Sequence, residues 1–493
     1  MTPARTLPLS VLALHAPQAA PADAQRLVPN REDEGPVPEG PPRPTQGAYV
    51  DQKEPGKGDA PGLGTIGFQG LSAAGVAPPD SDGSVGPNHY VQWINSRIAV
   101  FDKATGVMAP GFPIAGNVLF TSLGGVCASH NDGDPIVLYD SLADRWQISQ
   151  FAVGATEDPA ANSHQCVAVS AGPDPTGSWY VYDFPSVFGS PDDFIDYPKL
   201  STWTDAYYMT GKSFCSSGTY CTTGLYGVLY AFERAQMLVG LPARMVAYAN
   251  PAVVGGTSAP NILTTDVDGL TPPPPGRPAH AFWQRTTTSL GVVSLATTWG
   301  ATPAMTVTPL PDIPITATTS VSCTSNGQAN RRCVPQPTPA ADPADQLDAL
   351  SSRLMFRAPY RNLGATESVV LNHTIAGTSP VKAAVRWYEI RLETGTPTLF
   401  QSGTFAPDNT NRFMGSIAMD ASGNIALGYS RSARAAAGPP VVPAVIPEVS
   451  VAGRLAGDPP GTMTGDTVLK AGVGVQTGTG NRWGDYSTMN VDP

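Results

Sequence analysis

The stretch RFMGSIAMDASGNIALGYS, residues 412–430, predicts a tight β-hairpin. Two short apolar runs, Gly415 to Met419 and Ile425 to Tyr429, flank the turn Asp-Ala-Ser-Gly that ends at Gly423. Aspartate bonds its own backbone in such a turn and glycine accepts a positive φ, so the two runs fold back on each other as strands. A related pattern recurs along the chain: a charged residue, a small or apolar run, a turn, and an aromatic-rich run.

The composition favours an all-β fold. Gly and Pro number 51 each among 493 residues, and only 14% of the residues are charged. Such a chain is poor in long helices and rich in short strands that are joined by turns. The best helical pattern, around Asp342 to Leu354, is short. The length is sufficient for one large repeat domain or for two to three ordinary ones.

Seven recurring units predict a β-propeller. The clearest internal match pairs DYPKLS, from residue 196, with DYSTMN, from residue 485. Four-stranded units at this spacing are typical of propellers, whereas a pair of β-sandwiches is the alternative source of many short strands. We therefore expect about seven four-stranded blades within residues 63–493. The units begin at Asp82, Asp134, Asp196, Asp266, Asp348, Arg412 and Asp485.

The last unit contains only one strand before Pro493, so we expect the seventh blade to be incomplete. Either the segment from Gly64 to Leu71 completes it, or the chain is truncated and carries an exposed sheet edge. We favour the truncation.

Residues 1–62 are expected to lie outside the propeller. The apolar run from Leu7 to Leu14, followed by small residues, is a weak secretory-signal pattern. Residues 16 to about 62 are rich in Pro, Ala, Gly and acidic residues, which predicts a disordered linker.

Charge and cysteine content limit the partners and the compartment. The net charge is −11 and no Lys/Arg cluster occurs, which argues against nucleic-acid binding. No run approaches the roughly 20 apolar residues of a membrane span. The six cysteines fall as three near-neighbour pairs, although their connectivity cannot be deduced from the sequence. These pairs are Cys127 with Cys166, Cys215 with Cys221, and Cys323 with Cys333. Disulfides require an oxidising compartment, so we expect a secreted or cell-surface protein, as a monomer.

Four strings resemble a family of large exported bacterial proteins with propeller-type repeats. They are DGDPIVLYD (132–140), DYPKL (196–200), FMGSIAMD (413–420) and RWGDYS (482–487). The resemblance covers about residues 64 to 493 and implies a bacterial, extracellular propeller, but it implies no activity. The turn at Asp420 also resembles the Asp-box of sialidases without its downstream Trp. That box is a structural turn, so it suggests no catalytic residue.

In a propeller the first strand of each blade lines the central channel, so the residues that open the blades are expected to converge at one mouth. Two carboxylates roughly 5 to 9 Å apart would act as acid and base in glycoside cleavage, and arginines would bind a substrate carboxylate. Alternatively, each Asp caps backbone amides or pairs with an Arg. The candidate catalytic residues are Asp134, Asp196, Asp348, Arg412, Arg482 and Asp485.

Asp132, Asp134 and Asp485 are the candidate metal ligands, with His130 close by in the sequence. Clustered carboxylates favour Ca²⁺, which takes roughly six to eight oxygen ligands. No other cofactor is expected.

The sequence thus favours a secreted propeller that binds an extracellular glycan or protein and is stabilised by calcium. The alternative is a glycan-active hydrolase or lyase that uses an Asp/Arg cluster at the channel mouth. Whether any reaction is catalysed is left open. Carboxylates that crowd an open pocket would favour the enzyme, whereas carboxylates paired with backbone or Arg would favour the binding scaffold.

Overall fold

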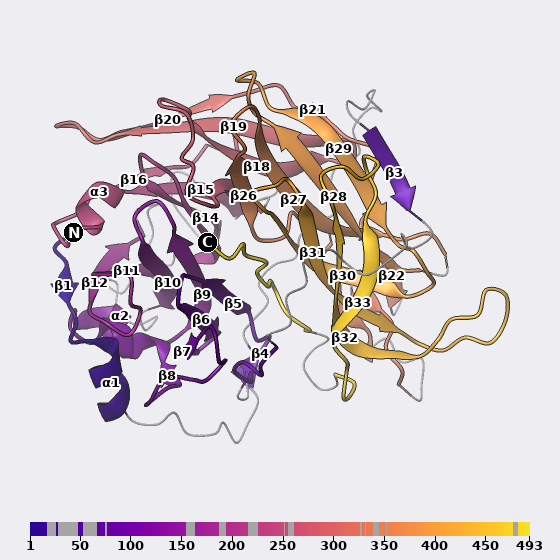
Figure 1. The fold of residues 1–493 in the computed structure, drawn as a ribbon, viewed down its shortest axis with the longest axis horizontal. Helices are drawn as coiled ribbons and strands as arrows, with labels where there is room; N and C mark the ends of the chain where they lie inside the picture. The colour runs from indigo at the N-terminus through magenta and orange to yellow at the C-terminus, as the bar shows by residue number, and fades with distance from the viewer. Residues whose placement is uncertain are drawn as a thin grey trace.

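A computed structural model gives an all-β architecture with six four-stranded blades among the residues it describes, and this confirms the predicted propeller. The sheets, named blades A to F in chain order, are arranged as a ring in Figure 1. The structure describes residues 1–16, 26–27, 48–52, 67–73, 76–153, 163–186, 194–214, 225–250, 252–254, 261–325, 328–330, 332–338, 345–351, 353–379, 381–476 and 482–493.

Blades A to C come from the first half of the chain. Blade A contains β5 (Ser81–Val85), β6 (His89–Ile94), β7 (Arg97–Asp102) and β8 (Ile114–Ala115). Blade B contains β9 (Gly133–Asp140), β10 (Arg145–Val153), β11 (Ser163–Ser170) and β12 (Trp179–Pro185). Blade C contains β13 (Phe194–Thr202), β14 (Tyr207–Phe214), β15 (Leu225–Phe232) and β16 (Met245–Tyr248). Successive strands pair antiparallel, so each blade is a meander that starts at the axis.

Blades D to F complete the ring. Blade D contains β17 (Leu263–Val267), β18 (Ala279–Thr286), β19 (Ser289–Thr298) and β20 (Ala304–Pro309). Blade E contains β26 (Ala358–Asn362), β27 (Glu367–Ala376), β28 (Ala383–Arg391) and β29 (Thr398–Phe405). Blade F contains β30 (Asn411–Met419), β31 (Ile425–Ala433), β32 (Val445–Arg454) and β33 (Thr464–Lys470). The inner strands β17 and β26 also pair in parallel, which joins blades D and E.

The hairpin predicted from residues 412–430 is confirmed as β30 and β31. Met419 pairs with Ile425, and the turn between them is held by Asp420, whose Oδ1 accepts the N–H of Ser422 at 2.8 Å. Gly423 has a φ of 79°, as the turn requires.

Short elements connect or cover the blades. They are β2 (Arg26–Leu27) paired with β4 (Val76–Ala77), β21 (Ile313–Pro314) on β19, β22 (Cys323–Ser325) with β23 (Gln328–Asn330), β24 (Arg332–Val334) with β25 (Leu347–Asp348), and the helices η1 (Gly116–Phe120), α2 (Gly125–Ser129) and α3 (Arg234–Met237). Across the described ranges, no helix has the length and apolar character that crossing a membrane requires.

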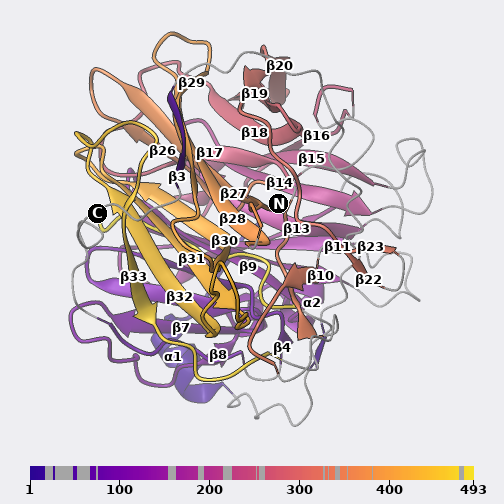
Figure 2. The same cartoon turned by 90° about the vertical axis from the view of Figure 1, so that its right-hand side faces the viewer.

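Two pieces of the segment predicted as a signal-like start and linker lie against the propeller. β1 (Ala4–Arg5) pairs with β12, and α1 (Leu9–His15) buries Leu9 and Ala13 in the core between blades A and B. β3 (Ala48–Gln52) adds in parallel to the outer edge of β29, as Figure 2 shows. Most of the predicted linker lies outside the described residues.

Three predicted unit starts do not open a blade. Asp266 is the fourth of the five residues of β17, so it lies near the end of an inner strand. Asp348 lies in the two-residue strand β25, and the inner strand of blade E begins ten residues later at Ala358. The C-terminal segment, residues 482–493, forms no strand. Instead it runs between blades F and A, toward the centre of Figure 1: Met489 N–H donates to Ser416 Oγ at 2.7 Å, and Asn490 Nδ2 donates to the Gly83 carbonyl at 2.7 Å. This segment therefore connects the first and last blades.

The core lies between neighbouring blades. One cluster of buried apolar side chains runs from blade B through C and D to E, a second joins A to B, and a third joins E to F. Six of the eight tryptophans are almost fully buried there. Aromatic pairs such as Phe184 and Phe232, with ring centroids 4.6 Å apart, link blade B to blade C.

Candidate functional site

The inner strands of blades B, C and F share a backbone irregularity. Asp134, Tyr197 and Met414 have φ values of 47°, 55° and 51°, and each is followed by a proline or a glycine. The strand register shifts at these positions. Proline has no N–H for the ladder and is tolerated at a bulge, which accounts for the pattern. Non-glycine residues at positive φ collect at functional sites, so this end of the axis is a natural place to look for one.

Buried polar side chains surround the axis at the starts of the inner strands. None of them is more than 8% exposed. This axial cluster consists of Asp80 and Asp82 from blade A, Asp134 from blade B, Tyr197 and Lys199 from blade C, and Arg482, Asp485 and Tyr486 from the C-terminal segment.

Lys199 is the cation at the centre of the axial cluster. Its Nζ lies 3.6 Å from the ring centroid of Tyr197 and 3.7 Å from that of Tyr486, and it donates to the Pro198 carbonyl at 3.0 Å. Burial lowers the pKa of Lys199 to about 8, although the charges of Asp134 and other cluster carboxylates oppose the shift. The ammonium is therefore held by two ring faces and the Pro198 carbonyl, while the charges of the nearby carboxylates favour its protonated form.

The cluster carboxylates are also held by the protein. Asp485 pairs with Arg482, and its backbone carbonyl accepts the Tyr197 hydroxyl at 2.8 Å. Asp80 Oδ2 accepts from Asn95 Nδ2 at 3.0 Å, while Oδ1 has no hydrogen-bond partner among the described residues. Burial, with the charges of Asp485 and Asp134, raises the pKa of Asp80 well above its usual value. A cluster this closed is a polar core, so it does not offer a substrate an entry.

Asp82 links three parts of the ring. Its Oδ2 accepts the Val137 N–H of β9 at 2.7 Å, and its Oδ1 accepts the Thr488 hydroxyl of the C-terminal segment at 2.6 Å. Burial raises the pKa of Asp82 to about 7, although these hydrogen bonds lower it.

Three of the six predicted catalytic candidates, Asp134, Arg482 and Asp485, meet in the axial cluster. Asp348 is close enough that its charge raises the pKa of Arg482, and its Oδ1 caps the Leu350 N–H at 3.0 Å. Asp196 precedes a cluster residue and accepts the Tyr197 N–H at 2.9 Å.

Arg412 lies elsewhere. Its guanidinium pairs with Asp408, at 2.8 Å, and with Asp466, and it lies 5.4 Å from the ring centroid of Phe405. Because all of these partners belong to the outer part of blades E and F, Arg412 does not join the axial cluster, and its proposed role stays a prediction.

The described residues contain no group of three or more His, Cys, Asp or Glu side chains that could hold a metal ion. Of the predicted ligands, Asp132 caps β10 by accepting the Val153 N–H at 2.8 Å, and Asp134 and Asp485 share the axial cluster with Lys199. Calcium therefore stays a prediction.

A small, partly open hollow, with about 20 Å³ of space for water, lies where the inner strands end, whereas the axial cluster lies where they begin. We call it the polar mouth. It is lined by Ser84, Val85, Leu138, Tyr139, Ser141, Asp266, Asp268, Gly269, Arg357, Asn490, Val491 and Pro493. Blades A, B and D, the residue before blade E and the C-terminal segment all contribute. Sequence reasoning missed this site, because no local pattern shows that these strand ends meet.

Arg357 organises the polar mouth. Its guanidinium donates to Asp266 at 2.7 Å and to both oxygens of Asp268, at 2.5 and 2.6 Å. Asp266 also accepts the Thr202 N–H at 2.8 Å. Burial raises the pKa of Asp266 to about 6, although Arg357 lowers it. Arg357 Nε has no hydrogen-bond partner among the described residues.

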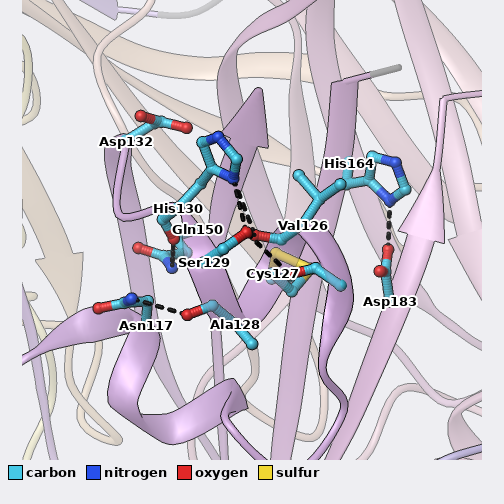
Figure 3. The surroundings of a disulfide bond; sticks show 12 residues. Asn117, Val126, Cys127, Ala128, Ser129, His130, Asp132, Gln150, His164 and Asp183 are labelled. Carbon is cyan, nitrogen blue, oxygen red and sulfur yellow. Dashed lines mark hydrogen bonds and ion pairs between the residues drawn. A yellow bond between two sulfur atoms is a disulfide. The ribbon is translucent and has the colours of Figure 1, made fainter. Parts of the chain in front are cut away.

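Two disulfides are present in the described residues. Cys323 bonds Cys333, and Cys127 bonds Cys166, which ties α2 to β11 (Figure 3). Figure 3 also shows His164 beside this bond, with Nδ1 2.5 Å from Asp183 Oδ1. The predicted near neighbours Cys215 and Cys221 lie outside the described residues.

No family model matches the chain, and no curated protein matches it. Among solved structures, the chain is similar to a subtype N11 neuraminidase-like protein of A/flat-faced bat/Peru/033/2010, at 8% identity over 87% of this chain and 99% of that one, with a TM-score of 0.35. The parainfluenza virus 5 hemagglutinin-neuraminidase ectodomain gives 9% identity, 88% and 87% coverage, and a TM-score of 0.34. A Trypanosoma rangeli sialidase gives 8% identity, 67% coverage and a TM-score of 0.26, and the chain spans only 36% of its length. At such scores the likeness carries no function over to this chain.

Proposed function

We propose that this protein is an extracellular β-propeller that recognises a glycan at the polar mouth. The observation that carries the proposal is the contrast between the two ends of the axis. The predicted cluster of blade-opening residues is buried and paired with backbone, Arg or Lys, which favours a binding scaffold. The polar mouth, in contrast, reaches the surface and is lined by polar side chains from several blades, although Asp266 and Arg357 within it are themselves buried and paired. A few convergent polar groups are what fixes the orientation of a ligand in a binding site.

The chemistry of the polar mouth fits sugar hydroxyls, which both donate and accept hydrogen bonds. Asp268 offers acceptors, Asn490 an amide and Ser84 a hydroxyl, while the Ser141 hydroxyl, which donates to the Gly269 carbonyl at 2.6 Å, is left as an acceptor. The net charge of −11 argues against a polyanionic ligand, because clustered phosphates would need Lys and Arg. The two disulfides are consistent with an oxidising, extracellular compartment.

A panel of immobilised glycans, followed by calorimetric titration of the best binder, tests this proposal. Asp268→Asn is expected to weaken binding about tenfold or more, because a charge-assisted hydrogen bond contributes about 1.5 to 3 kcal/mol. Asp312→Asn is the matched control, since Asp312 also pairs with an arginine, Arg285, at 3.1 Å, but does not line the mouth. Equal loss in both variants, or no glycan bound by the wild type, would contradict the proposal.

Glycan cleavage is the second candidate, because two carboxyl groups, those of Asp266 and Asp268, line the same hollow. A glycosidase needs one carboxylic acid that keeps its proton near neutral pH and a second carboxylate that stays ionised. Asp266, with a pKa of about 6, lines the same hollow as Asp268. In this reading Asp266 protonates the leaving oxygen, and Asp268 activates water or attacks the sugar.

Release of reducing ends from a polysaccharide panel distinguishes cleavage from binding. If the enzyme reading holds, Asp266→Asn and Asp268→Asn each abolish release while thermal unfolding shows that both variants remain folded. A wild-type protein that binds a glycan without releasing reducing ends is a lectin-like scaffold only. Unfolding followed with Ca²⁺ and with a chelator checks the calcium prediction on the same samples.

A further inference from the structure

The strand β3 is attached to the propeller in a different way from the helix α1. α1 buries two apolar side chains in the core between blades A and B. β3 lies on the outer edge of β29 (Figure 2) and contributes no buried side chain among those that the structure describes. Ala48 and Asp51 are exposed, while Val50 and Gln52 are half-buried. The attachment of β3 therefore depends little on apolar burial.

The surface that receives β3 is shaped for an extended chain. We call it the strap site, and it consists of the outer edge of β29 together with residues 461–463. A Cβ on Gly461, whose φ is 80°, would meet Val50 Cγ2 at 2.9 Å and the Val50 backbone nitrogen at 3.1 Å. A Cβ on Gly403 would meet the Gly461 carbonyl oxygen at 2.2 Å. Glycine at these two positions therefore lets β29, residues 461–463 and β3 lie this close together.

Buried residues of blades E and F hold the strap site in place. Gln401, only 1% exposed, accepts the Gly461 N–H with Oε1 at 2.8 Å and donates from Nε2 to Glu389 at 2.6 Å. The Met463 side chain is buried in the core between blades E and F. Because these contacts do not involve β3, the site is preformed, and a preformed site lowers the ordering cost of binding.

Gln52 makes the most specific contact with the strap site. Its Nε2 donates to the Met463 carbonyl at 2.6 Å, and its Oε1 accepts the Met463 N–H at 2.8 Å. A side-chain amide both donates and accepts, whereas a carboxylate only accepts and an apolar side chain does neither. The Gln52 backbone carbonyl also accepts the Ala406 N–H at 3.2 Å. The strap site therefore selects glutamine at this position of an extended chain.

We propose that the strap site is a binding site for an extended Val-x-Gln peptide, and that β3 is its exchangeable resident ligand. Peptides bind in this way by adding a strand to a sheet edge, where backbone hydrogen bonds supply affinity and side-chain contacts supply specificity. A preformed site and a resident strand that buries little side-chain surface fit this mode. A second Val-x-Gln peptide binds when β3 leaves, so β3 controls access to the site. Because the strap site shares no residue with the polar mouth, the inference does not depend on glycan binding.

Fluorescence anisotropy of a labelled peptide with the sequence of residues 46–54, added to the full chain, tests the proposal. In the wild type β3 competes from within the same chain at an effective concentration on the order of millimolar, so the added peptide is expected to bind weakly. The double variant Val50→Ser/Gln52→Ala weakens β3 and is expected to bind the peptide about tenfold or more tightly than the wild type does. A peptide with Gln52→Ala is the matched control ligand. It is expected to bind the double variant about tenfold more weakly, because two hydrogen bonds to Met463 are lost.

Equal affinity of the wild type and the double variant for the peptide would overturn the proposal, and so would equal binding of the two peptides. No binding to the double variant at about 1 mM peptide would overturn it as well, because the site would then not accept a separate chain. Hydrogen exchange of the β29 amides is expected to be faster in the double variant and to slow again when the peptide is added; exchange that the peptide leaves unchanged would contradict binding at this edge. A double variant that melts below the wild type by more than a few degrees is replaced by Gln52→Ala alone, for which the same order of affinities is expected.

Discussion

Asp82 is the residue whose titration has the clearest consequence for stability. Its pKa in the folded protein is about 7, above the value of 3.8 for an exposed carboxyl, because burial disfavours the charge. The folded state therefore binds a proton more tightly than the unfolded state between these values. The resulting stabilisation is present below pH 4 and is lost as the pH rises through 7.

We expect the wild type to lose about 4 kcal/mol relative to Asp82→Asn between pH 4 and pH 8, by the conversion of about 1.4 kcal/mol for each pKa unit. Burial lowers the pKa values of His280 and His373, so these histidines make both proteins more stable as the pH rises. This effect opposes that of Asp82 in the pH curve of either protein. It cancels in the difference between the two proteins, which is therefore the quantity to measure. Urea unfolding at several pH values gives this difference directly. A constant difference across the range would contradict the role of burial at Asp82.

Lys199 supports a second prediction. Replacing it by Met leaves the rings of Tyr197 and Tyr486 in contact with an apolar chain but removes the cation from Asp80, Asp134 and Asp485. Loss of one partner from a buried charge cluster typically costs about 3 to 5 kcal/mol.

Lys103→Met is the matched control, because Lys103 pairs at 2.7 Å with Asp492, which is largely exposed. A surface pair of this kind contributes at most about 1 kcal/mol. Denaturant midpoints at pH 7.5 test both variants. A Lys199→Met protein as stable as the control would show that the cluster does not need its cation.

A strand or hairpin could be predicted from the sequence where neighbouring residues alone determine its structure. The turn from Asp420 to Gly423 fixed the hairpin of blade F because side-chain capping and positive φ are properties of the turn itself. Asp348 carried the same local pattern, yet it lies in β25 before blade E. A short pattern of Asp and small residues does not distinguish an inner strand from the connection that precedes it.

The hairpin turn of blade F predicts how a substitution at Gly423 changes the stability of the protein. Gly423→Ala is expected to destabilise the protein by about 1 kcal/mol or more, because φ at this position is 79° and alanine disfavours it. Gly457→Ala is the control, since Gly457 is not among the positive-φ glycines and a Cβ there would meet no atom within 4 Å. Equal melting temperatures for the two variants would show that the turn tolerates a side chain.

The assembled ring depends on contacts that no local pattern contains. Asp134, Arg482 and Asp485 could be predicted at the axis because each one opens a recurring unit. Lys199 was missed although it lies in the repeated string DYPKLS, because its importance comes from rings and carboxylates supplied by other blades. Arg412 lies apart from the axial cluster for the opposite reason, because its partner Asp466 lies 54 residues further along the same blade.

Tyr486 is where the C-terminal segment meets three blades. Its hydroxyl donates to the Pro135 carbonyl of blade B at 3.0 Å, and its ring centroid lies 5.7 Å from that of Tyr197 in blade C. It also lies 6.2 Å from the ring of Phe356, next to blade E, and is only 3% exposed. The Tyr486 side chain therefore connects the segment that joins blades F and A to the buried cores of blades B, C and E.

We therefore expect Tyr486→Ala to destabilise the whole propeller by about 3 to 5 kcal/mol, the usual result of truncating a large buried aromatic. Tyr486→Phe keeps the ring contacts and loses only one hydrogen bond, so it should cost about 1 kcal/mol. Because blades F and A are joined through the same segment, amide exchange in the alanine variant should rise first in β5 and β30 and then in the other inner strands. If exchange rises only within residues 482–493 while β5 and β30 keep their protection, the segment lies on the ring without closing it.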